Sequence, residues 1–356
     1  MAGYPDAARL GDIGERAIVG QILAPRYRDG NLTFGDDVAD FGTIGGGVLV
    51  ATTDPAPLPV VWEFFERDFF DWGWLLAALN LSDLAAAGAD PLGLLTSLTM
   101  PNDTLVSDFV RLLDGIDAVC HQVGTQVRGG NLKESERAVC EATALGYVDG
   151  TPLSRLGAEP GDALYAFGEV GLFWAAVLRA ETHGGRAMTD VREGLARPRP
   201  LVSLGRAIRT SGAAKACMDA SDGLYAAICG LTSDQELGFL LQADEVVLSP
   251  RAKRLADGLD VEPVRFALGF GNLELVCAAD ASQESRLLQL ARRNRVHMTK
   301  LGIVQGESGI RVQRRGISGL MTNFDNERFT PTSQFTTGLS SFRERLMGQP
   351  LSRTWA

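Results

Sequence analysis

The residues of this chain that could do chemistry are mainly aspartates at the expected ends of strands and helices. Carboxylate oxygens in such places, together with substrate oxygens and water, are the ligands that Mg²⁺ bound to phosphate groups requires. The sequence shows no surplus of Lys or Arg beside these aspartates that would neutralise them. The pattern therefore indicates a site for several Mg²⁺ ions around a polyphosphate. The aspartates concerned are Asp36, Asp37, Asp54, Asp83, Asp219 and Asp222.

Asp83 belongs to an otherwise apolar segment, residues 74–91, whose spacing predicts a buried helix with Gly88 as its left-handed cap. Asn80 lies three residues before Asp83, so the two polar side chains share one face of this helix. A buried carboxylate is costly unless it meets a cation or a donor. Asp83 is therefore either a core residue paired with an arginine or a member of the metal site.

The other aspartates lie in motifs that also have a purely structural interpretation. Asp36 and Asp37 fit a solvated turn, but the strand expected at residues 47–54 ends in a further carboxylate, Asp54. The hexapeptide DASDGL, residues 219–224, reads as a helix N-cap. An N-cap explains one of its two acidic groups but not both.

Glycines and aromatic residues add two further features. Gly129 and Gly130 lie at the end of a probable strand, where they form either a hairpin turn or a place for the backbone to approach a phosphate. Residues 62–74 contain seven aromatic side chains in thirteen positions. This density favours core or a subunit interface, with a stacking wall for a planar ligand as the alternative.

Composition limits the class of protein. The 356 residues are 45% hydrophobic and 22% charged, as in a soluble globular protein of about two domains. A net charge of −10 argues against a surface for nucleic acid or for an anionic membrane. The five scattered cysteines predict reduced, buried thiols. With no secretory signal and no apolar run near the ~18 residues that span a bilayer, we expect a cytoplasmic protein.

The order of elements predicts an α/β (α+β) protein with a domain boundary in the turn-rich residues 149–162. We expect an N-terminal domain at residues 1–149, a C-terminal domain at 150–320 and a tail at 321–356 that shows no strong period. The expected helices are 11–29 (ended by Pro25), 74–91, 105–123, 171–183, 200–211 and 281–294. The expected strands are 47–54, 91–101, 126–135, 138–148, 162–171, 216–218, 274–279 and two within 297–313.

Seven motifs, in their order and spacing, resemble thiamine-monophosphate kinase. This family belongs to the ATP-binding superfamily that also holds aminoimidazole ribonucleotide synthetase, selenophosphate synthetase and the hydrogenase maturation dehydratase. The resemblance runs from about residue 10 to about residue 313. The motifs are GDDVA (35–39), TTD (52–54), NLSDLAAAGADP (80–91), RGGN (128–131), RLGAEPGD (155–162), MDASDGL (218–224) and GFGNLEL (269–275).

The resemblance implies a two-domain PurM-like fold, in which the N-terminal sheet pairs with that of a second subunit into a barrel and the C-terminal domain has a mixed sheet. It also implies that ATP and Mg²⁺ lie between the domains of a homodimer. The implied metal ligands are Asp36 or Asp37, Asp54, Asp83, Asp219 and Asp222. The implied nucleotide contacts are Thr53, Asn80, Gly129, Gly130 and Ser221, and Asp83, Asp222 and Asn131 are implied to take part in catalysis.

Three positions depart from the family pattern. The family's GGD is Gly129-Gly130-Asn131 here, which replaces a carboxylate by a weaker neutral ligand. Its His-Phe after TTD falls on Val61-Trp62, and its GEDYEL loses an acid and a tyrosine but keeps Glu274. We place Trp62, Asn272 and Glu274 near the acceptor, and we expect an acceptor other than thiamine monophosphate.

Three functions follow from these features. The first is Mg²⁺-dependent phosphoryl transfer from ATP to a small acceptor, by positioning and charge stabilisation without a dedicated base. The second is ATP-dependent activation of an amide or carboxamide oxygen, which leads to ring closure or dehydration. The third is a degenerate nucleotide-binding regulatory subunit, which Asn131 and Asn272 suggest.

Overall fold

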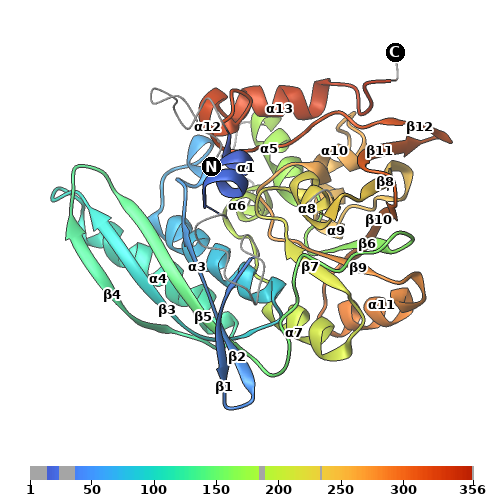
Figure 1. Ribbon diagram of the computed structural model, residues 1–356. Coiled ribbons are helices and arrows are strands. Elements are labelled where there is room, and N and C mark those ends of the chain that lie inside the picture. Colours follow the sequence, from blue (N-terminus) through green and yellow to red (C-terminus); the bar gives the residue numbers. More distant parts are fainter. Residues whose placement is uncertain (1–13, 24–36, 184–188, 233–234, 355–356) are drawn as a thin grey trace.

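A computed structural model describes residues 14–23, 37–183, 189–232 and 235–354 of the chain (Figure 1). Two β-sheets, of five and seven strands, organise these residues. The helix expected at 11–29 falls partly outside them, as does Pro25. Its described part forms α1 (Glu15–Ala17) and η2 (Ile18–Leu23).

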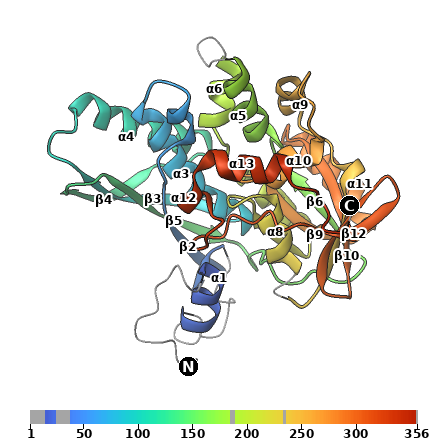
Figure 2. The same ribbon diagram turned by 90° about the horizontal axis from the view of Figure 1, so that it is seen from above.

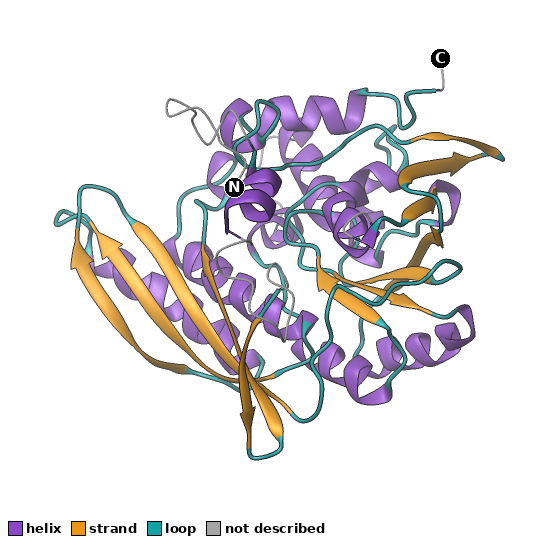
Figure 3. Ribbon diagram, in the orientation of Figure 1, coloured by secondary structure: helices purple, strands orange, loops and turns teal. Residues whose placement is uncertain are grey.

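The N-terminal sheet has the strand order β1-β2-β5-β3-β4, and its helices cover one face only (Figure 3). Its strands are antiparallel neighbours except for the parallel pair β3–β4. The strands expected at 47–54, 91–101, 126–135 and 138–148 are confirmed. The elements are β1 (Ala39–Ile44), β2 (Gly47–Pro55), η3 (Val60–Glu63), α3 (Phe69–Ala86), β3 (Asp90–Met100), α4 (Val106–Gln122), β4 (Val127–Glu134) and β5 (Val139–Val148).

Helix α3 begins five residues earlier than its apolar pattern predicts. The side chain of Asp68 accepts a hydrogen bond from the amide of Phe70 and so caps a first turn that the sequence leaves hidden among aromatics. At the other end, Gly88 has a φ of +68°, and its amide and the next one bond back to carbonyls of the last turn. This geometry confirms the left-handed cap predicted at Gly88.

The C-terminal sheet has the order β12-β11-β8-β10-β6-β9-β7 and is mixed, with β8–β11 the parallel pair. Both faces of this sheet are covered at its central strands, so all five residues of β6 are buried. Its strands are β6 (Ala163–Phe167), β7 (Ala216–Asp219), β8 (Gly238–Gln242), β9 (Leu275–Ala279), β10 (Met298–Gln305), β11 (Gly309–Arg314) and β12 (Ile317–Leu320). Its helices are α5 (Leu172–His183), α6 (Thr189–Ala196), α7 (Val202–Ser211), α8 (Leu224–Thr232), η5 (Ala243–Glu245), α9 (Pro250–Ala256), α10 (Pro263–Leu268), η6 (Ala281–Gln283) and α11 (Glu284–Arg293).

One hydrophobic core is shared by both halves of the molecule. Phe167 and Cys277 on one face of the C-terminal sheet pack with Leu204 of α7 and Leu287 of α11, and the same cluster continues into α3 through Leu81. The opposite face of that sheet packs on α5, α8, α9 and α10. Because α3 belongs to the shared core, its position relative to β7 and β9 is fixed by packing.

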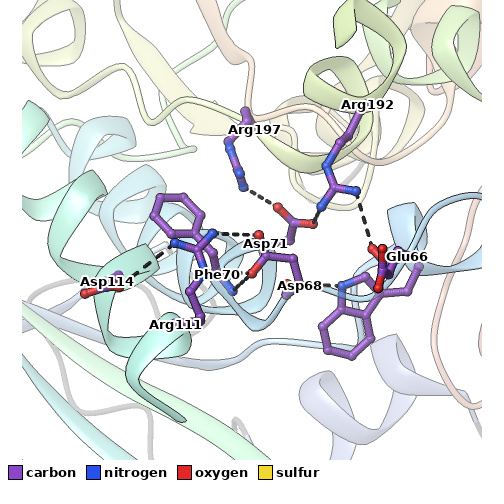
Figure 4. A network of polar contacts seen from close by, with 9 residues as sticks. Glu66, Asp68, Phe70, Asp71, Arg111, Asp114, Arg192 and Arg197 are labelled. Atoms are coloured by element: carbon purple, nitrogen blue, oxygen red, sulfur yellow. Dashed lines mark hydrogen bonds and ion pairs between the residues drawn. The ribbon is translucent and has the colours of Figure 1, made fainter. Parts of the chain in front are cut away.

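A polar network joins the start of α3 to α6 (Figure 4). Asp71 is fully buried and accepts hydrogen bonds from Arg192 and Arg197, which lie on or just after α6. Arg111 of α4 binds Asp68. A buried carboxylate with two guanidinium partners holds its elements in one relative position.

The tail forms α12 (Gln334–Thr337) and α13 (Leu339–Gly348), although its sequence shows no strong period. Figure 2 shows α13 running over the C-terminal half beside α10. Phe342 and Leu346 of α13 are buried in the C-terminal core. The five cysteines are free and buried, as predicted. In the described part of the chain, every helix is too short or too polar to cross a membrane.

Candidate active site

Three of the predicted aspartates meet in one place, although they come from three separate parts of the chain. Asp37 precedes β1, Asp83 lies on α3, and Asp219 ends β7. One carboxylate oxygen from each lies within 4.8 Å of the others. Three carboxylates this close repel one another unless protons or a metal ion neutralise them.

Helix α3 and strand β2 hold one side of this acid cluster. The side-chain oxygen of Asn80 accepts from the amide of Asp54 at 3.1 Å, and its nitrogen donates to the Asp54 carbonyl at 3.2 Å. The hydroxyl of Thr52 donates to Asp83 at 2.6 Å. Asn80 therefore clamps the end of β2 onto α3, and its predicted contact with phosphate stays a prediction.

The other side of the cluster is the DASDGL turn after β7. The amide and hydroxyl of Ser221 donate to one oxygen of Asp219, at 3.4 and 3.0 Å. The other oxygen of Asp219 is buried and has no hydrogen-bond partner. Gly223 has a φ of +104°, and a Cβ there would lie 2.8 Å from the amide of Phe270. The turn therefore depends on glycine and leaves one carboxylate oxygen available.

Burial and neighbouring carboxylates raise the pKa values of Asp83, Asp219 and the nearby Asp54. Burial, then the nearby Asp219, Asp54 and Asp37, raise the pKa of Asp83 well above its usual value. Burial is also the main cause of the raised pKa of Asp219. The pKa of Asp54 rises to about 6, first through burial and then through Asp219. Such values mark carboxylates that lack enough positive charge.

Two arginines reach the edge of the cluster, contrary to the expectation that no cation lies beside these aspartates. Arg155 forms an ion pair with Asp37, and Arg328 of the tail lies 3.1 Å from Asp222. Both come from more than a hundred residues away along the chain, so their pairing with these aspartates could not be seen locally, although Arg155 is the first residue of the RLGAEPGD motif. Asp83 has no ion pair within the described residues, so the alternative of a core Asp–Arg pair is wrong.

Gly129, Gly130 and Asn131 lie in the middle of β4, so the hairpin-turn interpretation is wrong. Across the sheet, Asp54 of β2 pairs with Ala142 of β5, Ala142 pairs with Thr96 of β3, and Thr96 pairs with Gly130 of β4. Three strand spacings separate Gly130 from Asp54, about 14 Å. Within one chain, Asn131 and the acid cluster therefore cannot bind the same ion. A Cβ at Gly130 would lie 2.3 Å from the Thr96 carbonyl, which explains this glycine by strand packing.

The remaining predicted residues are mostly engaged elsewhere. The hydroxyl of Thr53 donates to the carbonyl of Ala142. Trp62 packs against Phe69 and Trp72, in agreement with a core role. Asp36 lies outside the described residues, so its role stays a prediction.

Glu274 lies near Asp219 of the acid cluster, and Asn272 lies two residues before it in the chain. The side-chain oxygen of Asn272 accepts from the amide of Phe173 at 3.2 Å. Glu274 is only 4% exposed, and burial raises its pKa to about 8. Because Glu274 is enclosed by protein, this structure gives it no direct route to an acceptor.

The donor set fits Mg²⁺ on phosphate oxygens. Its ligands are hard carboxylate oxygens, one of them on Asp219 has no partner, and no soft sulfur or imidazole ligand joins them in the group. Ser221 and Thr52 fix the orientation of two of the carboxylates. The cluster is therefore preorganised to bind a hard divalent cation.

Comparison with known proteins identifies the two halves. The family model described as AIR synthase related protein, N-terminal domain, matches residues 35–148, and that of the C-terminal domain matches residues 159–315. A thiamine-monophosphate kinase of Methanospirillum hungatei is 31% identical over 231 residues, which cover 63% of this chain and 73% of that protein.

Solved structures give the same result for the fold. The structure described as AaThiL complexed with AMPPCP and TMP superposes with a TM-score of 0.75 at 23% identity, covering 88% of this chain and 97% of that one. Thiamine-monophosphate kinase from Stenotrophomonas maltophilia has a TM-score of 0.68 at 29% identity and covers 82% and 94% of the two chains. These likenesses confirm the mixed-sheet, two-domain PurM-like fold.

Proposed function

Because the chain belongs to the thiamine-monophosphate kinase family of AIR synthase related proteins, and is therefore an ATP-dependent kinase, we propose that its acid cluster binds ATP through Mg²⁺ and passes the terminal phosphoryl group to a small acceptor. The observation that carries this proposal is the convergence of Asp37, Asp83 and Asp219 within 4.8 Å. Burial raises the pKa values of Asp83 and Asp219, and one oxygen of Asp219 has no hydrogen-bond partner.

The residues of the chain contribute positioning and charge. Bound Mg²⁺ would neutralise the phosphate oxygens and draw charge from the transferring group. Thr52 and Ser221 hold the carboxylates of Asp83 and Asp219 in fixed directions, so binding requires little reorganisation. Asp222, at the exposed edge of the cluster, is the predicted ligand nearest to solvent and lies beside Arg328. We assign no general base, since phosphoryl transfer depends mainly on alignment.

The acceptor we propose is not thiamine monophosphate itself. Val61 and Trp62 replace the family's His-Phe, and Trp62 is occupied by its aromatic neighbours. Asn272 replaces an acid, and its oxygen already accepts from a main-chain amide. Residues expected to bind the family's acceptor are therefore changed or engaged, whereas those expected to bind the nucleotide are retained.

We also propose a homodimer. The face of the N-terminal sheet opposite α3 and α4 carries Leu95, Leu145 and Tyr147 with no covering element among the described residues. Leu95 is 44% exposed. An uncovered apolar sheet face in a protein of this size favours pairing with a second copy, as the barrel of the PurM-like fold requires.

Calorimetry with ATP in the presence of Mg²⁺ or EDTA tests the site. We expect binding only with Mg²⁺, because bare polyphosphate meets uncompensated carboxylates. Equal affinity in EDTA contradicts the metal-cluster proposal. A screen of candidate acceptors by ³¹P NMR then separates the chemistries, since a phosphorylated product indicates a kinase and inorganic phosphate indicates activation for ring closure or dehydration.

A further inference from the structure

A cavity of about 370 Å³ lies outside the acid cluster, none of whose aspartates lines it. It is bounded by the end of α4, the start of α5, the segment 197–204, Asn272 and Leu273, and the turn 294–297. Its volume is within the range of small-molecule sites, which is about 300–1,000 Å³. Apolar side chains such as Leu172, Leu201 and Val296 form part of its wall.

The cavity is positively charged in a chain whose net charge is −10. Three arginines line it, Arg197, Arg199 and Arg295, against a single carboxylate, Glu169. That carboxylate is engaged, since it accepts from Ser249 at 2.8 Å and lies 3.9 Å from Arg251. Arg199 and Arg295 are exposed and have no ion pair within the described ranges. Two cations are therefore available to a ligand.

Arg197 lines the cavity and is held by Asp71, as Figure 4 shows. It shares the single charge of Asp71 with Arg192, so this group of three carries a net positive charge. Its guanidinium also lies 4.4 Å from the ring centre of Phe70 and 5.2 Å from that of Trp74. A cation held in this way needs little ordering when an anion binds.

The loop that carries Arg197 and Arg199 has a restricted backbone. Its sequence from residue 197 is Arg-Pro-Arg-Pro, and each proline fixes φ. The indole of Trp74 donates to the carbonyl of Pro198 at 2.7 Å. Arg199 is therefore presented by a backbone that is restricted before any ligand arrives.

Buried protein separates this cavity from the acid cluster. Leu273 forms part of the cavity wall, and the next residue, Glu274, is 4% exposed and lies near both Glu169 of the cavity and Asp219 of the cluster. The carbonyl of Glu274 accepts from the amide of Ala220, which follows Asp219. A buried layer that contains Glu274 therefore lies between the cavity and the acid cluster.

We propose that this cavity is a second binding site, for a small organic anion with one phosphate or carboxylate group on an apolar body. The arginines bind the charged group and the leucine and valine side chains contact the body. The site is filled independently of Mg²⁺ and the nucleotide.

Titration of the full-length protein, saturated with Mg²⁺ and AMPPCP, tests the proposal. The probes are phenyl phosphate, benzoate and neutral benzyl alcohol, and calorimetry or NMR measures their binding. We expect one or both anions to bind with a Kd of about 1 mM or below, and benzyl alcohol to bind more weakly. The two anions decide whether the group recognised is phosphate or carboxylate.

Arg199→Ala/Arg295→Ala should weaken anion binding about tenfold or more without changing AMPPCP binding. Arg254→Ala/Arg293→Ala removes two exposed arginines outside the cavity and should leave anion affinity unchanged. The proposal is overturned if the cavity variant binds the anions with the affinity of the parent, or if benzyl alcohol binds as tightly as the anions. It is also overturned if AMPPCP prevents anion binding, or if binding does not saturate up to about 10 mM anion. Thermal denaturation confirms that both variants remain folded. A failure of the kinase proposal appears instead as a lack of nucleotide binding.

Discussion

At the scale of single residues, Asp83 is only 8% exposed, lacks an ion pair among the described residues, and has a pKa raised well above its usual value. The Thr52 hydroxyl donates to its carboxyl group, and an amide oxygen in the same place could accept that hydrogen bond. Replacing the carboxyl group by an amide therefore leaves no charge to be neutralised in the metal-free protein. It also removes a ligand from the metal site.

Asp83→Asn should leave the metal-free protein as stable as the parent, within about 1 kcal/mol, and abolish Mg²⁺-dependent ATP binding. Thermal denaturation in EDTA and calorimetry with Mg²⁺ and ATP measure the two effects. Asp114→Asn, an exposed change on α4, serves as the control. A stability loss on the order of 3–5 kcal/mol would instead indicate a buried ion pair.

Glu274 gives a pH dependence with a definite sign. Its pKa is raised from 4.5 to about 8 in the folded protein, so between these values the folded state holds a proton that the unfolded state has released. Stability from this group is therefore greatest below pH 4.5 and falls as pH rises toward 8.

Glu274→Gln should remove this loss. The variant should gain stability relative to the parent as pH rises from about 5 to about 8, by an amount on the order of a few kcal/mol. Urea unfolding in EDTA at the two pH values measures it, with exposed Glu307→Gln as the control. The same pH slope in the variant and the parent contradicts a protonated Glu274.

The residues of the candidate site were predictable only where the motif carried them. Asp37, Asp83 and Asp219 were identified from the sequence, and the structure brings them together. Arg155 opens the RLGAEPGD motif but is not assigned to the site from the sequence, and Arg328 lies outside all the motifs, because their aspartate partners are 118 and 106 residues away. The glycines of β4 allow either a hairpin turn or a backbone approach to phosphate from the sequence, and their place inside a closely paired strand is shown only by the structure.

At the scale of elements, α3 is positioned by backbone contact with α4. A Cβ at Gly115 of α4 would lie 2.2 Å from the carbonyl of Phe70, and one at Gly73 of α3 would lie 1.8 Å from that of Leu112. The two helices therefore approach closely only because both positions are glycine. This approach sets where α3 presents Asp83.

Gly115→Ala should push α3 and α4 apart and cost about 1–3 kcal/mol or more of unfolding free energy. Gly348→Ala, at a helical position where a new Cβ meets no atom within 4 Å, should cost nothing measurable. Urea unfolding of the two variants is the test. Equal stability of both would mean that α4 can shift without cost.

Element boundaries were predictable where side chains define them. The apolar spacing located α3 and Gly88 located its end, but its aromatic first turn was hidden because Asp68 caps it from outside the periodic segment. Helix α13 has only three buried residues, Leu339, Phe342 and Leu346, which is a short signal in a tail rich in polar residues. Tertiary packing thus decides the tail, and a single sequence contains little local trace of it.

At the scale of the whole molecule, the mixed C-terminal sheet is predicted only by the family resemblance, since the strand patterns leave β1, β8 and β12 unpredicted. The shared core is not predicted by either. It joins Leu81, Leu204 and Cys277, which are far apart in the chain and look like ordinary buried residues. The dimer is likewise invisible in one chain, except as the uncovered face of the N-terminal sheet.

That face provides the last prediction. Leu95 lies on the face of the sheet opposite α3, next to Thr143 on the neighbouring strand. An arginine at this position is harmless to a monomer, but in a dimer it would place a charge inside the interface between the two sheets. The parent should sediment as a dimer at about 1 µM, and Leu95→Arg should shift it toward the 38.1 kDa monomer with its thermal stability measured alongside. Leu58→Arg changes a residue that is 62% exposed and lies outside the sheet, so it controls for added charge. A parent that sediments as a monomer, or a Leu95→Arg variant that stays dimeric, would show that this face is not the contact between copies.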